Sequence, residues 1–208
     1  MEAKRLSKKV WLVVILMVVS LFSTGCLSMM HYPSRVVDDG GICMGLGTDV
    51  GMSLYEKGSL NMMNSLFVQV GIGHGIDCGV DLMLYKFIPC VQILSIRKQF
   101  DFNAVVIDGI TLDAGATLSF DRIYGSASLL KKGFSLTITC SKNIFKDSDD
   151  DDWFINSIYG RLAYEYLFKN RFIVMPFVTC GRSKTDIISD IQAGNYIGAG
   201  ISITYKTK

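Results

Sequence analysis

The sequence is poor in charge, proline and histidine. Charged residues make up 19% of the chain, below the roughly one quarter usual in soluble domains, and there are only 3 prolines and 2 histidines. The net charge is +2, and the first nine residues supply much of the positive side, so no basic patch indicates nucleic-acid binding. After residue 26 no stretch sustains the i, i+3, i+4, i+7 apolar spacing of an amphipathic helix. We therefore expect neither a nucleic-acid partner nor a helical bundle.

Cysteine is present, but its spacing fits neither a disulfide framework nor a metal site. Five cysteines follow Cys26, an odd number at wide intervals: Cys43, Cys78, Cys90, Cys140 and Cys180. No CxxC pair and no Cys/His spacing of a zinc site is present. We expect no metal and no dissociable cofactor.

The first 26 residues have the order of a secretory signal. A basic stretch at residues 4–9 precedes an apolar run from Val10 to Phe22, and small residues lead to Cys26. The run of about 13 residues is shorter than the roughly 20 that a membrane-spanning helix needs. We predict a cleaved signal peptide over residues 1–25; the alternative is an uncleaved N-terminal anchor.

The end of this signal resembles the lipobox of bacterial lipoproteins. The four positions read Ser23-Thr24-Gly25-Cys26, with Ser23 where leucine is commonest. The resemblance implies that lipoprotein-processing machinery cleaves before Cys26 and attaches diacylglycerol and an N-acyl chain to it. Two or three acyl chains anchor a protein stably, whereas one does so only marginally. Leu27 in place of aspartate favours sorting to the outer membrane under the rule of enteric bacteria.

Downstream of Cys26, apolar and polar residues alternate with a period of two. The alternation is strict from Ile110 to Phe120, from Phe134 to Ser141 and from Tyr196 to Tyr205. Ten such segments are predicted as strands: roughly 43–55, 64–73, 76–86, 90–100, 104–120, 122–131, 133–146, 154–167, 171–182 and 194–206. Most exceed the five or six residues of a soluble strand and suit a tilted transmembrane strand of about 9–11 residues.

The connections between these segments alternate in length. Short junctions are predicted around 74–76, 101–103, 131–133 and 169–171, and longer ones at 56–63, 147–153 and 183–195. Short turns at one end and long loops at the other are typical of outer-membrane barrels, whose short turns face the periplasm. Ten strands place both termini at the short-turn end. A lipid on Cys26 would then lie in the periplasmic leaflet.

Alternation alone does not tell which face of a barrel meets lipid. The polar faces consist of glycine, serine and threonine with few charges, and the mean hydropathy is +0.34, both unusual for a water-facing sheet. We predict an all-β, antiparallel, up-and-down barrel of about ten membrane-spanning strands over residues 42–208, with residues 26–41 as a lipidated tether. A lipid-anchored soluble barrel that binds an apolar ligand, as lipocalins do, is the alternative.

The mature chain resembles a family of small Gram-negative outer-membrane β-barrels of uncharacterised function. The matching stretches are VGIGHGIDCGVDLML, TLDAGATLSF, LAYEYLFKNRFIVMPFV and NYIGAGISITY. The resemblance implies an outer-membrane location, contact with outer-membrane lipids, insertion by barrel-assembly machinery, and a structural, surface-interaction or narrow-pore role. The chain departs from the family at its end, because Lys206-Thr207-Lys208 follow Tyr205, whereas such barrels usually end on an aromatic residue.

Six charged residues fall on the predicted lumen face. They are Asp49, Asp77, Asp81, Asp113, Arg161 and Glu165. A charge in a narrow lumen is costly unless it is paired, and the guanidinium of Arg161 can bind carboxylates through two hydrogen bonds. Either a structural ion-pair network or a selectivity element of a pore would use these residues, and barrels of this size are mostly filled by their own side chains.

An acidic loop contains Asp147, Asp149, Asp150, Asp151 and Asp152. Clustered carboxylates can bind Ca²⁺ or Mg²⁺, but this spacing is not that of an EF-hand. The loop is therefore a possible cation site or, as is commoner for such runs, a solvated loop.

The two histidines do not indicate an enzyme. His31 lies in the predicted tether and His74 in a tight turn, and neither is expected beside the serine and acid of a hydrolase. We predict a non-catalytic protein, with a lipid-modifying enzyme as a further alternative.

Two smaller features complete the expectations. Pro176 predicts a bulge in its strand, because proline cannot donate a ladder hydrogen bond. Aromatic residues near strand ends predict girdles at the membrane interfaces: Phe145, Trp153, Tyr159, Tyr164, Tyr166, Tyr196 and Tyr205.

Overall fold

The computed structural model describes residues 31–53, 60–85, 88–102, 104–117, 122–143, 157–183 and 194–207. The strands are β1 (Ile42–Ser53), β2 (Leu60–Gly73), β3 (Ile76–Tyr85), β4 (Ile88–Asp101), β5 (Gly109–Thr117), β6 (Arg122–Lys131), β7 (Phe134–Asn143), β8 (Ser157–Tyr164), β9 (Tyr166–Phe168), β10 (Phe172–Ser183) and β11 (Gly194–Lys206). No helix among these residues is long and apolar enough to cross a membrane.

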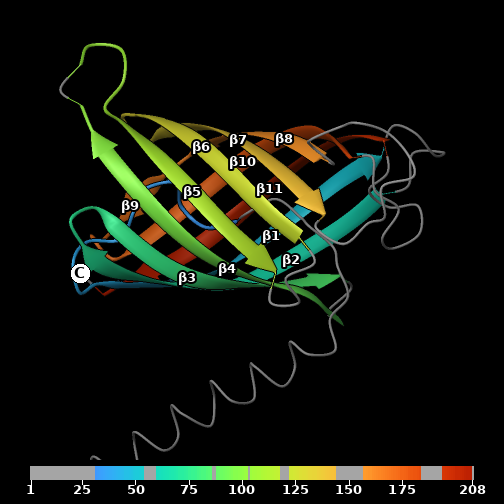
Figure 1. The fold of residues 1–208 in the computed structure, drawn as a ribbon, viewed down its shortest axis with the longest axis horizontal. Helices are drawn as coiled ribbons and strands as arrows, with labels where there is room; N and C mark the ends of the chain where they lie inside the picture. The colour runs from blue at the N-terminus through green and yellow to red at the C-terminus, as the bar shows by residue number, and fades with distance from the viewer. Residues whose placement is uncertain are drawn as a thin grey trace, which may run out of the picture.

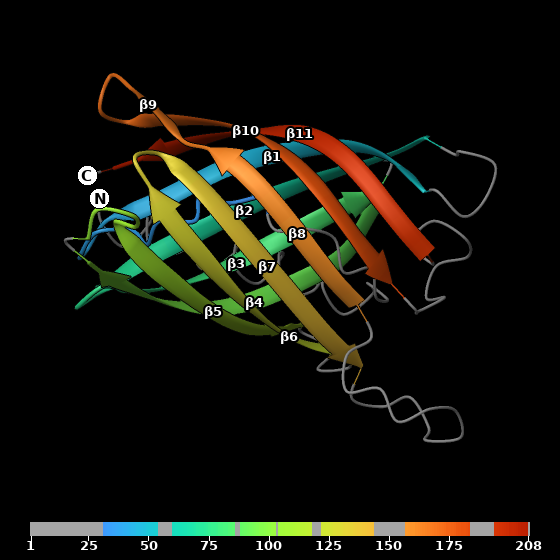
Figure 2. The same cartoon turned by 90° about the horizontal axis from the view of Figure 1, so that it is seen from above.

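The strands close into an antiparallel barrel. Each pairs with its neighbour along the chain, except that β8 and β9 both pair with β10, and β11 pairs with β1, from Cys43 opposite Lys206 to Ser53 opposite Tyr196. The short strand β9 continues β8 in the same register against β10, so the wall has ten strands (Figures 1 and 2). The predicted all-β up-and-down barrel is confirmed.

Short turns gather at the end of the barrel that holds the C-terminus (Figure 1). Two of them are two-residue hairpins with positive φ at both residues, His74–Gly75 and Lys132–Gly133, and a third, the three-residue turn 169–171, has positive φ at Lys169 and Asn170. Positive φ at both central positions is the turn geometry that matches the twist of a hairpin. These three junctions lie where the sequence predicts them.

The fourth junction at this end differs from the prediction. β4 ends at Asp101 and β5 begins only at Gly109, so the predicted strand start at residue 104 is wrong. The intervening chain forms a loop closed by a hydrogen bond from Phe102 N to Asp108 O (2.7 Å). Its apolar residues around Val105 and Val106 imitate a strand in sequence but pair with no other strand.

The two faces of the wall have opposite chemistry. On β7, Phe134, Leu136 and Ile138 point outward and are about half exposed, whereas Ser135 and Thr137 point inward and are buried. The same holds around the barrel, with leucine, isoleucine and valine outside and serine, threonine, aspartate and arginine inside. A soluble barrel needs the reverse arrangement. The lipocalin-like alternative is therefore wrong, and the barrel spans a membrane.

Pro176 does not produce the predicted bulge. The register of β10 against β11 continues unbroken through the pair Pro176–Ile201. The ladder on the other side is interrupted at Glu165, between β8 and β9, without a register shift. The missing N–H of Pro176 thus coincides with a gap in pairing rather than an inserted residue.

Outward aromatic residues form one girdle, at the short-turn end. Its members are Phe100, Phe134, Tyr164, Tyr166, Phe168, Phe172 and Tyr205. Tyr159 and Tyr196 face the lumen instead, so the prediction is wrong for them. Phe145 and Trp153 lie outside the described residues.

Candidate functional site: the filled lumen

The lumen is occupied by the chain's own N-terminal part. Residues 31–37, here called the luminal segment, precede β1 and run into the barrel from the short-turn end. At the rim, Gly40 N donates to Gly71 O (3.1 Å) and Gly71 N donates to Gly41 O (3.0 Å). Further in, His31, Tyr32 and Val37 are buried. The sequence assigns these residues to a tether and gives no sign that they fill the barrel.

Glycines in the wall make room for this segment. A Cβ atom at Gly71 would overlap the backbone oxygen of Asp38, and one at Gly47 would overlap the Cβ of His31. The wall is therefore shaped at two levels, at the rim and deeper inside, to let another stretch of backbone approach closely.

Arg97 on β4 holds the middle of the luminal segment. Its Nε and Nη2 donate to the two carboxylate oxygens of Asp77 (2.8 and 2.5 Å), and its Nη1 donates to the carbonyl oxygen of Pro33 (2.5 Å). The guanidinium also lies 4.7 Å from the ring centre of Tyr32. Asp77 accepts in addition from Val37 N (2.8 Å). This buried, forked pair joins β3 to β4, and each of its members also holds one residue of the luminal segment.

The hydroxyl of Tyr32 donates to Asp113 Oδ2 on β5 (2.5 Å). Tyr124 on β6 donates to the other oxygen of the same carboxylate at 3.3 Å. The ring of Tyr32 packs edge-on against Phe67, with centroids 6.0 Å apart. Asp113 thus accepts one hydrogen bond from the luminal segment and one from the wall.

Ser34 lies between a base and an acid of the wall. Its backbone N donates to Glu165 Oε1 (2.6 Å), while Arg161 Nη2 donates to its Oγ (2.8 Å). Arg161 Nη1 also donates to the carbonyl oxygen of Tyr32 (3.2 Å). The sequence predicts Arg161 as the main partner of the acids, but the forked partner of Asp77 is Arg97, which the sequence analysis missed.

All six predicted lumen residues line the interior, at two levels. Asp77, Asp113, Arg161 and Glu165 hold the luminal segment, as described above. Asp49 and Asp81 do not: Asp49 accepts from the hydroxyl of Tyr196 (3.0 Å), and Asp81 is buried on β3. The arrangement is an ion-pair and hydrogen-bond network organised around an inserted peptide.

His31 departs from the sequence expectation. Its Nδ1 lies 2.7 Å from Ser65 Oγ, and its ring centre lies 5.4 Å from that of Phe177. His31 therefore faces a serine, but the expectation that neither histidine lies beside both the serine and the acid of a hydrolase is not contradicted. The second ring nitrogen has no hydrogen-bond partner among the described residues, so no acid there orients the ring, and the side chain is fully buried.

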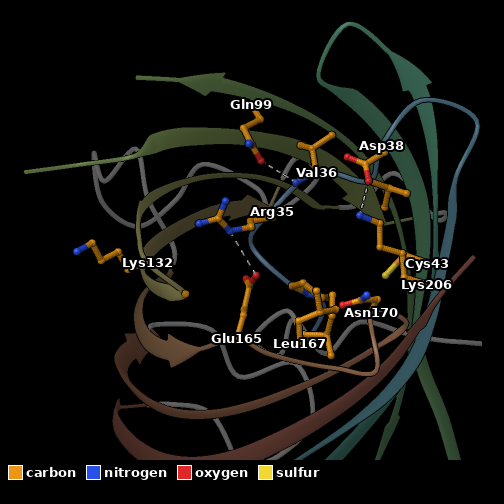
Figure 3. Close-up of a pocket in the computed structure, with 14 residues that line it drawn as sticks. Arg35, Val36, Asp38, Cys43, Gln99, Lys132, Glu165, Leu167, Asn170 and Lys206 are labelled. Carbon is orange, nitrogen blue, oxygen red and sulfur yellow. Dashed lines mark hydrogen bonds and ion pairs between the residues drawn. The ribbon is translucent and has the colours of Figure 1, made fainter. Parts of the chain in front are cut away.

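The mouth at the short-turn end is an open vestibule of about 540 Å³ (Figure 3). Arg35, Lys132 and Lys206 line it together with Asp38 and Glu165, so both signs of charge are present. Inside, the cavity between Arg97 and Arg161 measures only about 10 Å³, room for roughly one water molecule. Between these two arginines the lumen is filled rather than open.

The described residues include neither a cluster that could hold a metal ion nor a disulfide. No three histidine, cysteine, aspartate or glutamate side chains within the described ranges group closely enough to hold a metal ion. Cys43, Cys78, Cys140 and Cys180 are free thiols. The acidic loop with Asp147 and Asp149–Asp152, and the predicted lipid site Cys26, lie outside the described residues.

No protein-family profile and no curated protein matches the sequence. Among solved structures the chain is similar to the N-terminal β-barrel domain of Pseudomonas aeruginosa OprF, with 6% identity, coverage of 81% of this chain and 98% of that one, and a TM-score of 0.35. It is also similar to Neisserial surface protein A, with 10% identity, coverage of 80% and 97%, and a TM-score of 0.37. Ail of Yersinia pestis matches with 9% identity, coverage of 81% and 99%, and a TM-score of 0.29. At these TM-scores the function must be inferred from the chain's own residues.

Proposed function

We propose that this chain is an outer-membrane β-barrel lipoprotein of a Gram-negative envelope, closed to solutes by its own luminal segment, with a structural or surface-interaction role. The outward apolar band and the aromatic girdle support the membrane location. Lipidation of Cys26 and a periplasmic short-turn end belong to the same proposal and rest on the sequence pattern.

The observation that carries the non-conducting role is the occupied lumen. The luminal segment contributes a tyrosine, a carbonyl oxygen and backbone N–H groups to Arg97, Asp113 and Glu165. Without it, these buried charges would lose partners that water would have to replace. The segment is thus built into the barrel rather than lying loosely in it, and a pore would require its removal.

The same geometry supports a non-catalytic role. His31, which alone among the described residues pairs an imidazole with a buried serine, is enclosed by the wall and by neighbouring segment residues. The lipid-modifying alternative predicts that His31→Ala and His74→Ala alter lipid species, and unchanged lipids in both variants would eliminate it.

Conductance in planar bilayers tests the proposal. We expect the intact protein to be silent and a variant lacking residues 31–37 to conduct, because the lumen would fill with water. An Arg35→Ala/Asp38→Ala variant is the matched control, since both side chains face the vestibule and the segment stays in place. A change in gel mobility on boiling reports that each barrel is folded. Steady channels in the intact protein would replace the proposal with the narrow-pore role.

A further inference from the structure

The loop between β4 and β5 is fixed at its base by hydrogen bonds to the neighbouring β6–β7 hairpin. Asp108 accepts from Lys131 Nζ (3.0 Å) and from the backbone N of Lys132 (2.6 Å), while its own N donates to Leu130 O (2.8 Å). Phe102 N closes the loop on Asp108 O. Four hydrogen bonds at the base fix the position of the tip.

The tip exposes two apolar side chains. Val105 is 94% exposed and Val106 is 80% exposed, whereas the lipid-facing residues of the strands reach at most 58%. Because Val105 and Val106 bury almost no surface against the rest of the protein, they do not stabilise the fold. Their placement indicates contact with something outside the chain.

The direction of the loop identifies that contact. In Figure 1 the loop rises at the upper left and leaves the barrel end sideways, away from the barrel axis, rather than across the mouth. Immediately before it, Phe100 and Phe102 are exposed, and Phe100 belongs to the outward aromatic girdle. Lys98 lies beside the Phe100 ring, with Nζ 5.7 Å from its centre. The valines therefore extend the lipid-facing surface, next to a cation suited to lipid phosphates.

We propose that this loop inserts Val105 and Val106 into the headgroup–acyl boundary of the leaflet at the short-turn end, as a lateral membrane contact beside the barrel wall. The inference rests on the proposed membrane placement of that end. Such a contact fixes the depth of the barrel and its tilt relative to the lipid surface.

Tryptophan fluorescence in vesicles tests the contact. In a W153F background, which removes the remaining tryptophan of the mature chain, V106W is reconstituted in phosphatidylcholine vesicles with or without brominated acyl chains. We expect blue-shifted emission that brominated lipid reduces by about twofold or more, as for interfacially buried residues. The matched control is D38W, whose position faces the vestibule at the same end (Figure 3); its emission should stay at longer wavelength and unquenched.

Two outcomes overturn the proposal. Emission from V106W as red as that of D38W places the tip in water, and a blue shift without lipid quenching shows a protein contact, such as a second copy. Heat-modifiable gel mobility is measured on the same samples. A folded, inserted barrel with an unquenched tip refutes the loop contact alone, whereas loss of the mobility shift in the unmutated protein refutes the membrane barrel itself.

Discussion

Arg97 and Asp77 form the buried pair on which the filling of the lumen depends most. We expect Arg97→Met to lower the free energy of unfolding by about 3–5 kcal/mol, because Asp77 would remain buried without its partner. The double variant Arg97→Met/Asp77→Asn should be clearly more stable than the single one, since no lone charge is left. Urea unfolding in detergent, followed by tryptophan emission or gel mobility, measures both. Equal destabilisation of the two variants would contradict the role of the charge pair.

Gly47 tests the close approach of the luminal segment. A methyl group there overlaps His31, so Gly47→Ala should displace the segment and lower stability by about 1–3 kcal/mol, as overpacking does. Gly125→Ala is the matched control: its Cβ would face outward and meet only the Asp113 backbone oxygen at 3.8 Å. Differential unfolding of the two alanine variants gives the answer. A Gly47 variant as stable as the Gly125 variant would mean that the segment adapts freely.

At the residue scale, the sequence predicts faces better than partners. Strict alternation placed Asp77, Asp113 and Arg161 inside, because a side chain's face follows from its parity in the strand. Partners depend on which strands lie across the lumen and on what fills it. The sequence does not predict Arg97 as a lumen residue, because apolar and polar residues alternate poorly along its strand. It does not predict Tyr32 either, because nothing in the sequence of a tether indicates burial.

Among the elements, the β4–β5 loop carries a pH dependence. The backbone N–H of Lys132 and the ammonium of Lys131 lower the pKa of Asp108. A lowered pKa in the folded protein means that the anchoring contributes stability above the unfolded value of about 3.9 and loses it as the pH falls through the folded value. The lipid quenching of V106W should therefore persist from pH 7 to about pH 4 and weaken only below it.

Asp108→Asn provides the comparison for that loop. The amide keeps an acceptor oxygen for Lys132 N but loses the charge that faces Lys131. We expect weaker quenching at pH 7 and no further change on acidification. Quenching that falls with pH equally in both proteins would assign the dependence to another group.

The same loop marks the limit of prediction at the element scale. Period and length located nine of the ten wall strands to within a few residues, because a tilted membrane strand needs about ten residues of alternation. The fifth was extended too early, since Ala104 to Ile107 are apolar in a row and look like strand. What stops the strand is the hydrogen bonding of Asp108, a tertiary contact that no local pattern encodes.

For the whole molecule, the proposed lipid anchor and the filled lumen make demands on the same short stretch of chain. Five residue steps separate Cys26 from His31, and an extended chain of that length spans about 17 Å. His31 contacts Gly47, five residues into β1 from the rim at Ile42, which is a similar distance along the strand. If Cys26 carries lipid in the leaflet at the short-turn end, as proposed, five residue steps are just enough to reach from that leaflet to His31.

Deleting residues 28–30 should break this compatibility. The remaining steps reach only about 7 Å, so lipid on Cys26 would draw the luminal segment outward, and we expect conductance in planar bilayers together with lower stability. In a Cys26→Ser background no lipid pulls on the luminal segment, so the same deletion should leave the segment in place and the barrel without conductance. Both backgrounds should remain in the membrane, because the outward apolar band alone holds the barrel there. Identical conductance with and without Cys26 would show that no lipid pulls on the segment.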